Sequence, residues 1–311
     1  MIVAQNLTKH YRKKIAVEDI SFKVETGKVT GFLGPNGAGK STTMRLMLGL
    51  DSGQGKTTFD DKPLAAYTQP SKIVGILLEA KAFHPTRSAQ NHLGILAAAG
   101  GIPSSRVLEV LDIVGLADVA KKGPGKFSLG MAQRLGIAAA ILGQPKYLLL
   151  DEPANGLDPE GIAWLRSFIK DYAAQGNAVF VSSHLLSEMS QMADNIVVIG
   201  KGKLIASTSV ADMLAGNGHA SVTVRSSDSA KLEAVLKQQS FTYSKQSGSF
   251  QVNGVKTDDI GKAAFTAGVP ILELAGHNTS LEEAFLEITS GAQEYKAHTA
   301  HTDSKAKKGK S

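Results

Sequence analysis

The segment GPNGAGKST, from Gly34 to Thr42, has the residue types and spacing of a phosphate-binding loop. Glycines let a backbone wrap closely enough for several N–H groups to point into one concavity, and a helix that opens there adds partial positive charge. An apolar run precedes the segment and a helical pattern follows it, as the motif requires. Lys40 would then reach the β- and γ-phosphates of a nucleotide, and Ser41 would ligate Mg²⁺. The residues expected at the nucleotide are Gly34, Pro35, Asn36, Gly37, Ala38, Gly39, Lys40, Ser41 and Thr42.

A second glycine-rich segment, GQGKTT at 53–58, resembles this loop but lacks two of its features. The residue five positions before Gly55 is Leu50 rather than glycine, and a strand rather than a helix is expected after the segment. We therefore interpret 53–58 as a turn.

Acidic residues follow the all-apolar run YLLL at 147–150. Such a run is typical of a parallel strand that is covered on both faces, and the carboxyl ends of parallel strands border the ligand crevice. We expect Asp151 to hold Mg²⁺ through water and Glu152 to orient a water molecule for attack on the γ-phosphate. His184 follows another buried run, at 178–183, and we expect it to contact the γ-phosphate.

The elements that must position these residues alternate between strand and helix patterns over 1–215. They predict an α/β fold with a mostly parallel sheet, the phosphate loop after one strand, and a helical insertion at about 80–145. Residues 216–290 show a β-α-β-β-α-β order with an appended helix, which predicts a small α+β accessory domain. Residues 291–311 carry five lysines against Glu294 and Asp303, and we expect a disordered basic tail that is solvated rather than bound to lipid or nucleic acid.

Composition excludes some classes of protein. The net charge of +6 is mild, and the absence of cysteine excludes disulfides and thiolate metal sites. The longest apolar runs are about half of the ~20 residues that a membrane span needs, and the first residues alternate like a strand rather than a signal peptide. We therefore expect a cytoplasmic protein without a membrane span.

The phosphate loop, SLGM at 128–131, DEP at 151–153, GLD at 156–158 and His184 occur in an order and spacing that resemble the nucleotide-binding subunit of ABC transporters. The resemblance covers about 1–215. SLGM, where most relatives have SGGQ, is similar to the ATPases of bacterial exporters of the bacitracin and lantibiotic type. The resemblance implies an ATPase that uses ATP and Mg²⁺ to power a separate membrane permease. Such an ATPase would export an antibiotic or another small molecule or peptide, from a peripheral position at the inner face of the membrane.

The resemblance also implies that two ATPase domains pair head to tail, with each ATP between them. Ser128 and the N–H groups of the helix that begins near Gly130 would bind the γ-phosphate of the partner's ATP. Tyr11 would stack on adenine, Asp158 would lie in the loop between the two sites, and Glu79 would contact Mg²⁺. Taken alone, Ser128 also suits the N-cap of an apolar core helix.

Other classes of P-loop protein fit the sequence less well. Soluble ABC proteins that act on ribosomes usually carry two ATPase domains in one chain, and those that act on DNA insert a long coiled coil. Neither a second phosphate loop nor sustained heptads occur here. A P-loop kinase would need a pocket for an acceptor substrate, for which the sequence gives no sign. We expect no specific nucleic-acid partner.

Overall fold

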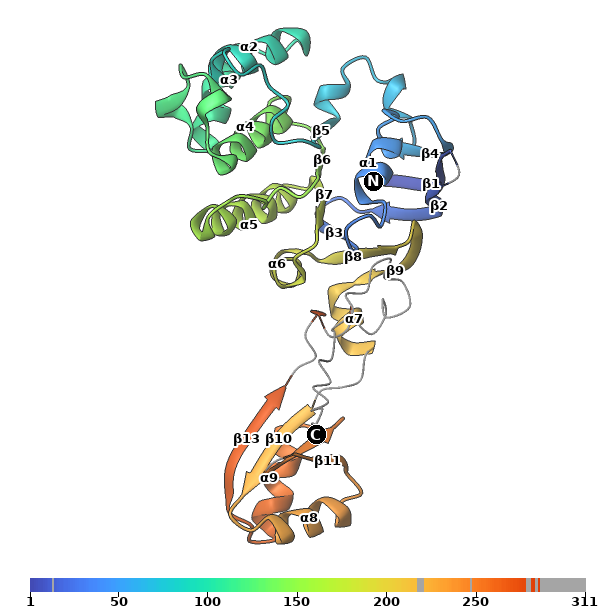
Figure 1. The fold of residues 1–311 in the computed structure, drawn as a ribbon, viewed down its shortest axis with the longest axis vertical. Coiled ribbons are helices and arrows are strands. Elements are labelled where there is room, and N and C mark those ends of the chain that lie inside the picture. Colours follow the sequence, from blue (N-terminus) through green and yellow to red (C-terminus); the bar gives the residue numbers. More distant parts are fainter. Residues whose placement is uncertain (13, 217–220, 247, 278–280, 283–284, 286–311) are drawn as a thin grey trace, which may run out of the picture.

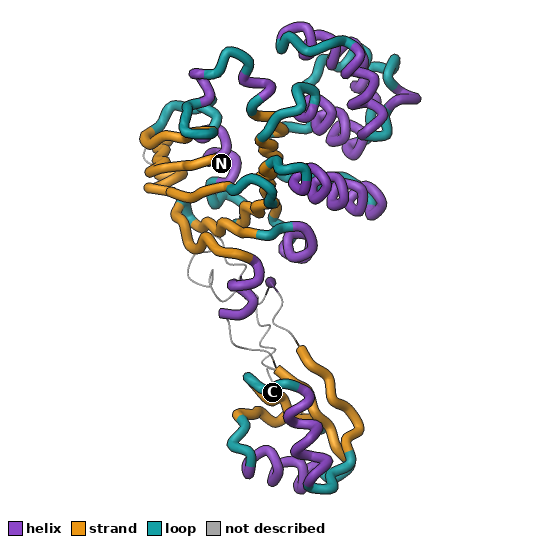
Figure 2. Tube along the Cα trace, turned by 180° about the vertical axis from the view of Figure 1, so that it is seen from behind, coloured by secondary structure: helices purple, strands orange, loops and turns teal. Residues whose placement is uncertain are grey.

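The computed structural model describes residues 1–12, 14–216, 221–246, 248–277, 281–282 and 285 (Figures 1 and 2). The predicted basic tail, 291–311, lies outside these residues. The strands are β1 Ile2–Tyr11, β2 Lys14–Val24, β3 Val29–Leu33, β4 Gln54–Phe59, β5 Val74–Leu77, β6 Tyr147–Leu150, β7 Ala178–Ser183, β8 Asn195–Gly200, β9 Lys203–Ser209, β10 Ser221–Ser226, β11 Thr242–Gln246, β12 Ser249–Asn253 and β13 Ile271–His277. The α-helices are α1 Lys40–Met47, α2 Ala89–Ala99, α3 Ser105–Ile113, α4 Leu129–Ile141, α5 Pro159–Ala174, α6 Leu186–Met192, α7 Val210–Gly216, α8 Ser229–Gln238 and α9 Thr257–Thr266.

The central sheet has six strands in the order β5-β6-β7-β3-β8-β9. Every neighbouring pair is parallel except β8 and β9, which form an antiparallel hairpin. This confirms the predicted α/β fold with a mostly parallel sheet.

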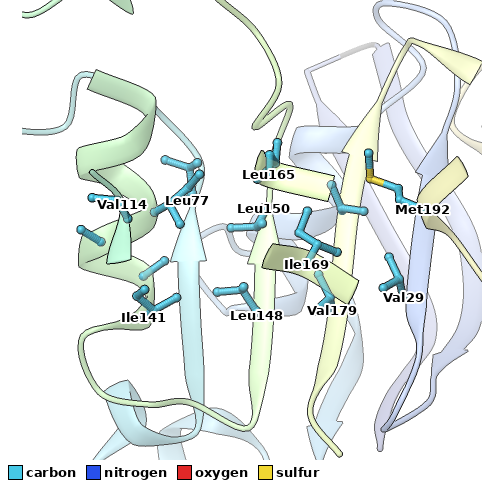
Figure 3. Packing of buried hydrophobic residues seen from close by; sticks show 14 of the residues in the cluster. Val29, Leu77, Val114, Ile141, Leu148, Leu150, Leu165, Ile169, Val179 and Met192 are labelled. Atoms are coloured by element: carbon cyan, nitrogen blue, oxygen red, sulfur yellow. The ribbon is translucent and has the colours of Figure 1, made fainter. Parts of the chain in front are cut away.

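The packing of strand β6 explains why its sequence is apolar throughout. Successive side chains of a strand point to opposite faces of the sheet. Leu148 and Leu150 enter the hydrophobic cluster that contains α4 and α5, whereas Tyr147 and Leu149 enter the cluster that contains α1. Figure 3 shows Leu148 and Leu150 on the side of the sheet where Leu165 and Ile169 of α5 lie. Because both faces are covered, no position in the strand is free to be polar.

The second face of the central sheet packs against α1 and a three-stranded antiparallel sheet, β2-β1-β4. Phe180 joins the two sheets, because its ring stacks on Phe32 of β3 at 4.9 Å and on Phe22 of β2 at 5.4 Å between centroids. Such aromatic contacts add to the area that is buried. They hold the two sheets together at β3, the strand that precedes the phosphate loop.

The segment 53–58 is not the turn that we expected. Residues Gln54–Phe59 form β4, which pairs with β1 along Ile2 to Gln5. Gly55 has a φ of +87°, and a Cβ there would overlap the carbonyl oxygens of Gln5 and Asn6. The glycine is therefore explained by close contact between two strands. The segment does not open a helix.

The expected helical insertion is present as α2, α3 and α4, which share one hydrophobic cluster with α5 and α6. Figure 1 places α2, α3, α4 and α5 on the same side of the central sheet. This cluster holds α4 firmly against the rest of the fold.

The strands and helices from Ser221 to His277 form the small α+β unit. Its sheet has the order β11-β12-β10-β13, all antiparallel, which is the ferredoxin-like arrangement of a β-α-β-β-α-β chain. Val222, Val224, Phe250 and Val252 of the sheet and Leu232 of α8 belong to its own cluster.

After β13 the chain returns to the larger unit. Leu281, Glu282 and Phe285 are the described residues of the appended helix, and all are helical. Leu281 and Phe285 are buried in the cluster of the larger unit, together with Met213 of α7 and Met189 of α6. In the part of the chain that the structure describes, no helix is long and apolar enough to cross a bilayer.

This return contact predicts that Phe285→Ala destabilises the larger unit. Removing a buried phenylalanine should lower the free energy of unfolding by about 3–5 kcal/mol. Trp164, the single tryptophan of the chain, packs against the same cluster, so its fluorescence during denaturant unfolding measures the effect. Phe265→Ala is the control, because Phe265 is 87% exposed. An unchanged Trp164 transition in Phe285→Ala would contradict the contact.

Candidate active site

The predicted site residues follow strands that end side by side. Leu33 of β3 pairs with Ser183 of β7, and Leu150 of β6 pairs with Val181 of β7 and with Leu77 of β5. Gly34, Asp151, His184 and Glu79 come one or two residues after these strand ends. They therefore lie along the carboxyl edge of the central sheet, where open α/β sheets bind ligands.

The loop from Gly34 to Gly39 requires glycine for steric reasons. A Cβ on Gly34 would lie 2.5 Å from the carbonyl oxygen of Ile199, and one on Gly39 would lie 2.6 Å from that of Ala16. Gly37 and Gly39 also have φ values of +81° and +106°, which favour glycine. The loop leads directly into α1, whose first turn contains no acidic residue. The first N–H groups of a helix have no partner inside it, so this turn suits an anion.

Lys40, Glu152 and His184 form a chain of polar contacts across three strand ends. Lys40 is only 7% exposed; its Nζ donates to the carbonyl oxygen of Gly34 at 2.8 Å and lies 3.4 Å from Oε1 of Glu152. Nδ1 of His184 lies 2.7 Å from Oε2 of Glu152. Because an ionised carboxylate only accepts hydrogen bonds, Nδ1 of His184 carries the proton in this contact.

Asp151 is held by a serine of the neighbouring strand. The Oγ of Ser182 donates to Oδ1 of Asp151 at 2.5 Å and accepts from the N–H of Glu152 at 2.9 Å. A carboxylate at Asp151 and a hydroxyl at Ser41 are oxygen ligands of the kind that Mg²⁺ prefers, together with substrate phosphates. The donor set at this edge therefore fits Mg²⁺ with nucleotide. Among the described residues, no group of three or more His, Asp or Glu side chains could hold a metal ion without oxygen atoms from the nucleotide.

The backbone of Glu152 adopts an uncommon conformation and is held on both sides. Its φ of +47° lies in the left-handed region, which is rare for residues with a side chain. Its N–H donates to Ser182, and its carbonyl oxygen accepts a hydrogen bond from Nε2 of Gln133 at 2.9 Å. Gln133 is on α4 and is only 4% exposed.

A buried acid on α6 lies near His184 and Glu152. Glu188 of α6 is 8% exposed, and its Oε2 has no hydrogen-bond partner among the described residues. Burial raises the pKa of Glu188, while the charges of Arg166 and His184 oppose that shift.

Tyr11 lies near Thr42, which is in the first turn of α1. Its hydroxyl donates to Oδ2 of Asp51 at 2.9 Å, and the ammonium of Lys9 lies 4.9 Å from the centre of its ring. The hydrogen bond to Asp51 raises the pKa of Tyr11, and the nearby Thr42 hydroxyl opposes the shift. The ring is half exposed and close to the phosphate loop.

The residues expected to meet a partner's nucleotide are not part of this group. Ser128 is the N-cap of α4, and its Oγ accepts from the N–H of Met131 at 3.1 Å. Asp158 is the N-cap of α5, where Oδ1 accepts from the N–H of Gly161 at 2.9 Å. Both residues are exposed, as is Glu79. Gly130 lies against the loop after Glu152, since a Cβ there would be 3.0 Å from the carbonyl oxygen of Gly156.

The structure thus brings together the phosphate loop, Asp151, Glu152 and His184. It adds Ser182 and Gln133, which the sequence analysis did not single out. Ser182 had one signal, since it is the first of two serines that end an otherwise apolar strand. Gln133 had a weaker signal, a polar residue within a mostly apolar helix.

Comparison with protein families identifies two regions of the chain. The family model described as "ABC transporter" matches residues 17–155, and a domain of unknown function matches residues 220–282. The first match contains the phosphate loop, Ser128, Asp151 and Glu152. The second coincides with the ferredoxin-like unit.

Curated relatives match much or nearly all of the chain. The bacitracin transport ATP-binding protein of Bacillus licheniformis is 37% identical over 306 residues, which are 94% of this chain and 98% of that protein. The lantibiotic transport ATP-binding protein of Streptococcus pyogenes is 38% identical over 206 residues, which are 66% of this chain and 89% of that protein.

Solved structures share the fold. An ATP-binding subunit of an ABC transporter superposes with a TM-score of 0.64 at 26% identity, over 70% of this chain and 93% of that one. A dimeric ATP-binding cassette in a post-hydrolysis state, bound to ADP and phosphate, superposes with a TM-score of 0.60 at 21% identity, over 68% of this chain and 99% of that one.

The contacts of Ser182 predict the effect of Ser182→Ala. The change removes two hydrogen bonds and leaves the N–H of Glu152 without its partner, so the free energy of unfolding should fall by about 1–3 kcal/mol. Chemical denaturation measures this, with the exposed residue Ser187, changed to alanine, as the control that should stay within about 0.5 kcal/mol. Equal stability of the two variants would exclude Ser182 as the support of this backbone.

Proposed function

Because the chain belongs to the ATP-binding subunits of ABC transporters, which bind and hydrolyse ATP, we propose that it works as one half of a head-to-tail pair that powers a separate permease. The observation that carries the proposal is the contact chain Lys40–Glu152–His184 at the mouth of the phosphate loop. In this chain of contacts, Glu152 as the general base lies between Lys40, the phosphate-binding cation, and His184, which orients its carboxylate.

Each chain supplies the residues that act on its own ATP. The N–H groups of Gly37 to Thr42 and the ammonium of Lys40 bind the β- and γ-phosphates. Ser41 would hold Mg²⁺ directly and Asp151 would hold it through water, Glu79 would contact it, and the ion would neutralise charge on those phosphates. Glu152 accepts the proton of the attacking water, and His184 holds the Glu152 carboxylate in place. Tyr11 stacks on adenine, a contact that is worth about 1–3 kcal/mol in nucleic-acid complexes.

The partner chain completes the site. Ser128 and the first N–H groups of α4, near Gly130, bind the γ-phosphate of the partner's ATP, and Asp158 lies in the loop between the two sites. The exposure of Ser128 supports this, because Ser128 caps the N-terminus of α4, where a phosphate of another chain can approach. The shared fold of a dimeric cassette supports the same pairing.

We assign the ATPase domain to 1–215 and the accessory domain to 216–290. Leu281 and Phe285 add to the core of the ATPase domain.

The names of the relatives support the transport role. Relatives that transport bacitracin and lantibiotics support export of a peptide antibiotic, with the chain held at the membrane through its permease.

An apolar groove supports the permease contact. It has a volume of about 780 Å³ and lies between the end of α1, the segment 68–71, β5, the end of α2 and the end of α4. Leu50, Ile76 and Leu96 line it and are exposed. A groove of this kind suits the apolar face of a short helix, such as one from a membrane subunit.

A basic surface lies on the same helical insertion. Backbone hydrogen bonds join the segments 85–90 and 120–125, from Gly125 to Pro85 and from Ala89 to Lys122. These segments carry three exposed cationic side chains, those of Arg87, Lys121 and Lys122, and Lys126 follows directly after the second segment. We propose that acidic residues of the permease contact this surface.

The mechanism predicts that Glu152→Gln binds ATP but hydrolyses it about 10²- to 10⁴-fold more slowly, because an amide cannot accept the proton. ATP-bound pairs should accumulate and elute as dimers in size-exclusion chromatography. Glu160→Gln, at an exposed acid of α5, is the control and should keep wild-type turnover. Wild-type turnover in Glu152→Gln would remove Glu152 from the mechanism.

The role of Ser128 is tested in the same background. Ser128→Asp keeps a good N-cap but places negative charge against phosphate, so the trapped dimer should be lost. Ser128→Asn caps equally well without charge and should retain more of the dimer. A stable ATP dimer with Ser128→Asp would show that α4 does not face the nucleotide.

The groove predicts that Leu96→Glu weakens binding to the permease by about 10-fold or more, because the charge would be buried at an apolar contact. The measurement is the fraction of the protein in washed membranes of the cells that produce it. Leu108→Glu on α3 is the control, since Leu108 is also exposed but does not line the groove. Equal membrane fractions for the two variants would place the contact elsewhere.

A further inference from the structure

Gln133 connects the helix that Ser128 caps with the backbone of Glu152. Its Nε2 donates to the Glu152 carbonyl oxygen at 2.9 Å, and the side chain is buried. A buried glutamine amide that reaches the main chain of an adjoining loop orients that loop, because both groups lose their alternative partners in water.

The N-terminus of α4 touches the same loop a second time. The side chain of Leu129 packs against Gly156, which has a φ of +79° and no room for a Cβ beside that leucine. Gly130 also lies close to this loop, since a Cβ there would be 3.0 Å from the carbonyl oxygen of Gly156. Residues 152–157 therefore contact α4 at both ends of the loop, through Gln133 and through Leu129.

A displacement of α4 would be transmitted to Glu152. The helix is a rigid element, and Gln133 lies about 7–8 Å along its axis from Ser128. The peptide of Glu152 is in the sparsely populated left-handed region, so it keeps its orientation only while its neighbours hold it. The N–H side is held by Ser182 of the sheet, and the carbonyl side is held by Gln133 of the helix.

We propose that Gln133 is a positioning residue that transmits the engagement of α4 with the partner's ATP to Glu152 of the same chain. This inference rests on the proposed function, in which Ser128 at the start of α4 meets the partner's γ-phosphate. One helix then contacts two nucleotide sites, the partner's through its N-terminus and its own through Gln133. Hydrolysis at one site thereby depends on ATP at the other.

The test compares variants that keep or lose the hydrogen-bond donor in the full-length protein. Gln133→Met has a similar length but no donor, and we expect kcat for ATP to fall about 10- to 100-fold while KM changes less than about 2-fold. The Hill coefficient for ATP should fall towards 1. Gln133→His retains a neutral N–H donor of similar reach and should recover most of the turnover. Gln191→Met, at an exposed glutamine of α6, is the control.

The expected pattern is therefore a loss of kcat and cooperativity in Gln133→Met with recovery in Gln133→His. Equal kcat in wild type and Gln133→Met, or equal losses in the methionine and histidine variants, would overturn the inference. If Gln133→Met does not fold, Gln133→Asn, whose donor is one methylene short, replaces it. Glu152→Gln is measured in parallel: if it does not trap an ATP dimer, the proposed function has failed, whereas a trapped dimer with fully active Gln133→Met rejects the relay alone.

Discussion

The pairing of the Lys40 ammonium with the Glu152 carboxylate is the interaction on which the site depends. Lys40 is almost fully buried, and a buried charge is tolerated only when it is paired and hydrogen-bonded. The two residues are 112 positions apart in the sequence, so a covered parallel sheet has to bring their strand ends together. The glycines of the loop let Lys40 approach, and Ser182 and His184 fix Glu152.

Much of this arrangement could be predicted from the sequence because its signals are local. The phosphate loop is one continuous motif, Asp151 and Glu152 follow an apolar run, and His184 follows a second run that ends in two serines. The rule that parallel strands end at a common edge then places them together. The segment 53–58 shows the limit of local signals, since pairing with β1 decided its structure.

Other contacts depend on tertiary packing and left little trace in the sequence. The hydrogen bond between Gln133 and Glu152 joins helix α4 to the residues that follow β6. It depends on how α4 packs against the sheet, and no periodic pattern in the sequence specifies it. The contact of Leu129 with Gly156 is similar, because it follows from how closely α4 approaches the loop. Leu129 thus packs against its own chain although 46% of it stays exposed.

The path of the chain around the ferredoxin-like unit has a consequence for the architecture. The backbone leaves the hydrophobic cluster of the larger unit after α7, and it re-enters that cluster at Leu281 and Phe285. The ferredoxin-like unit is therefore inserted within the larger unit rather than appended after it. The sequence of the ferredoxin-like unit is free to diverge, or the unit to be exchanged for another module of similar span. The larger unit keeps its core as long as α7 on one side and Leu281 and Phe285 on the other remain in place.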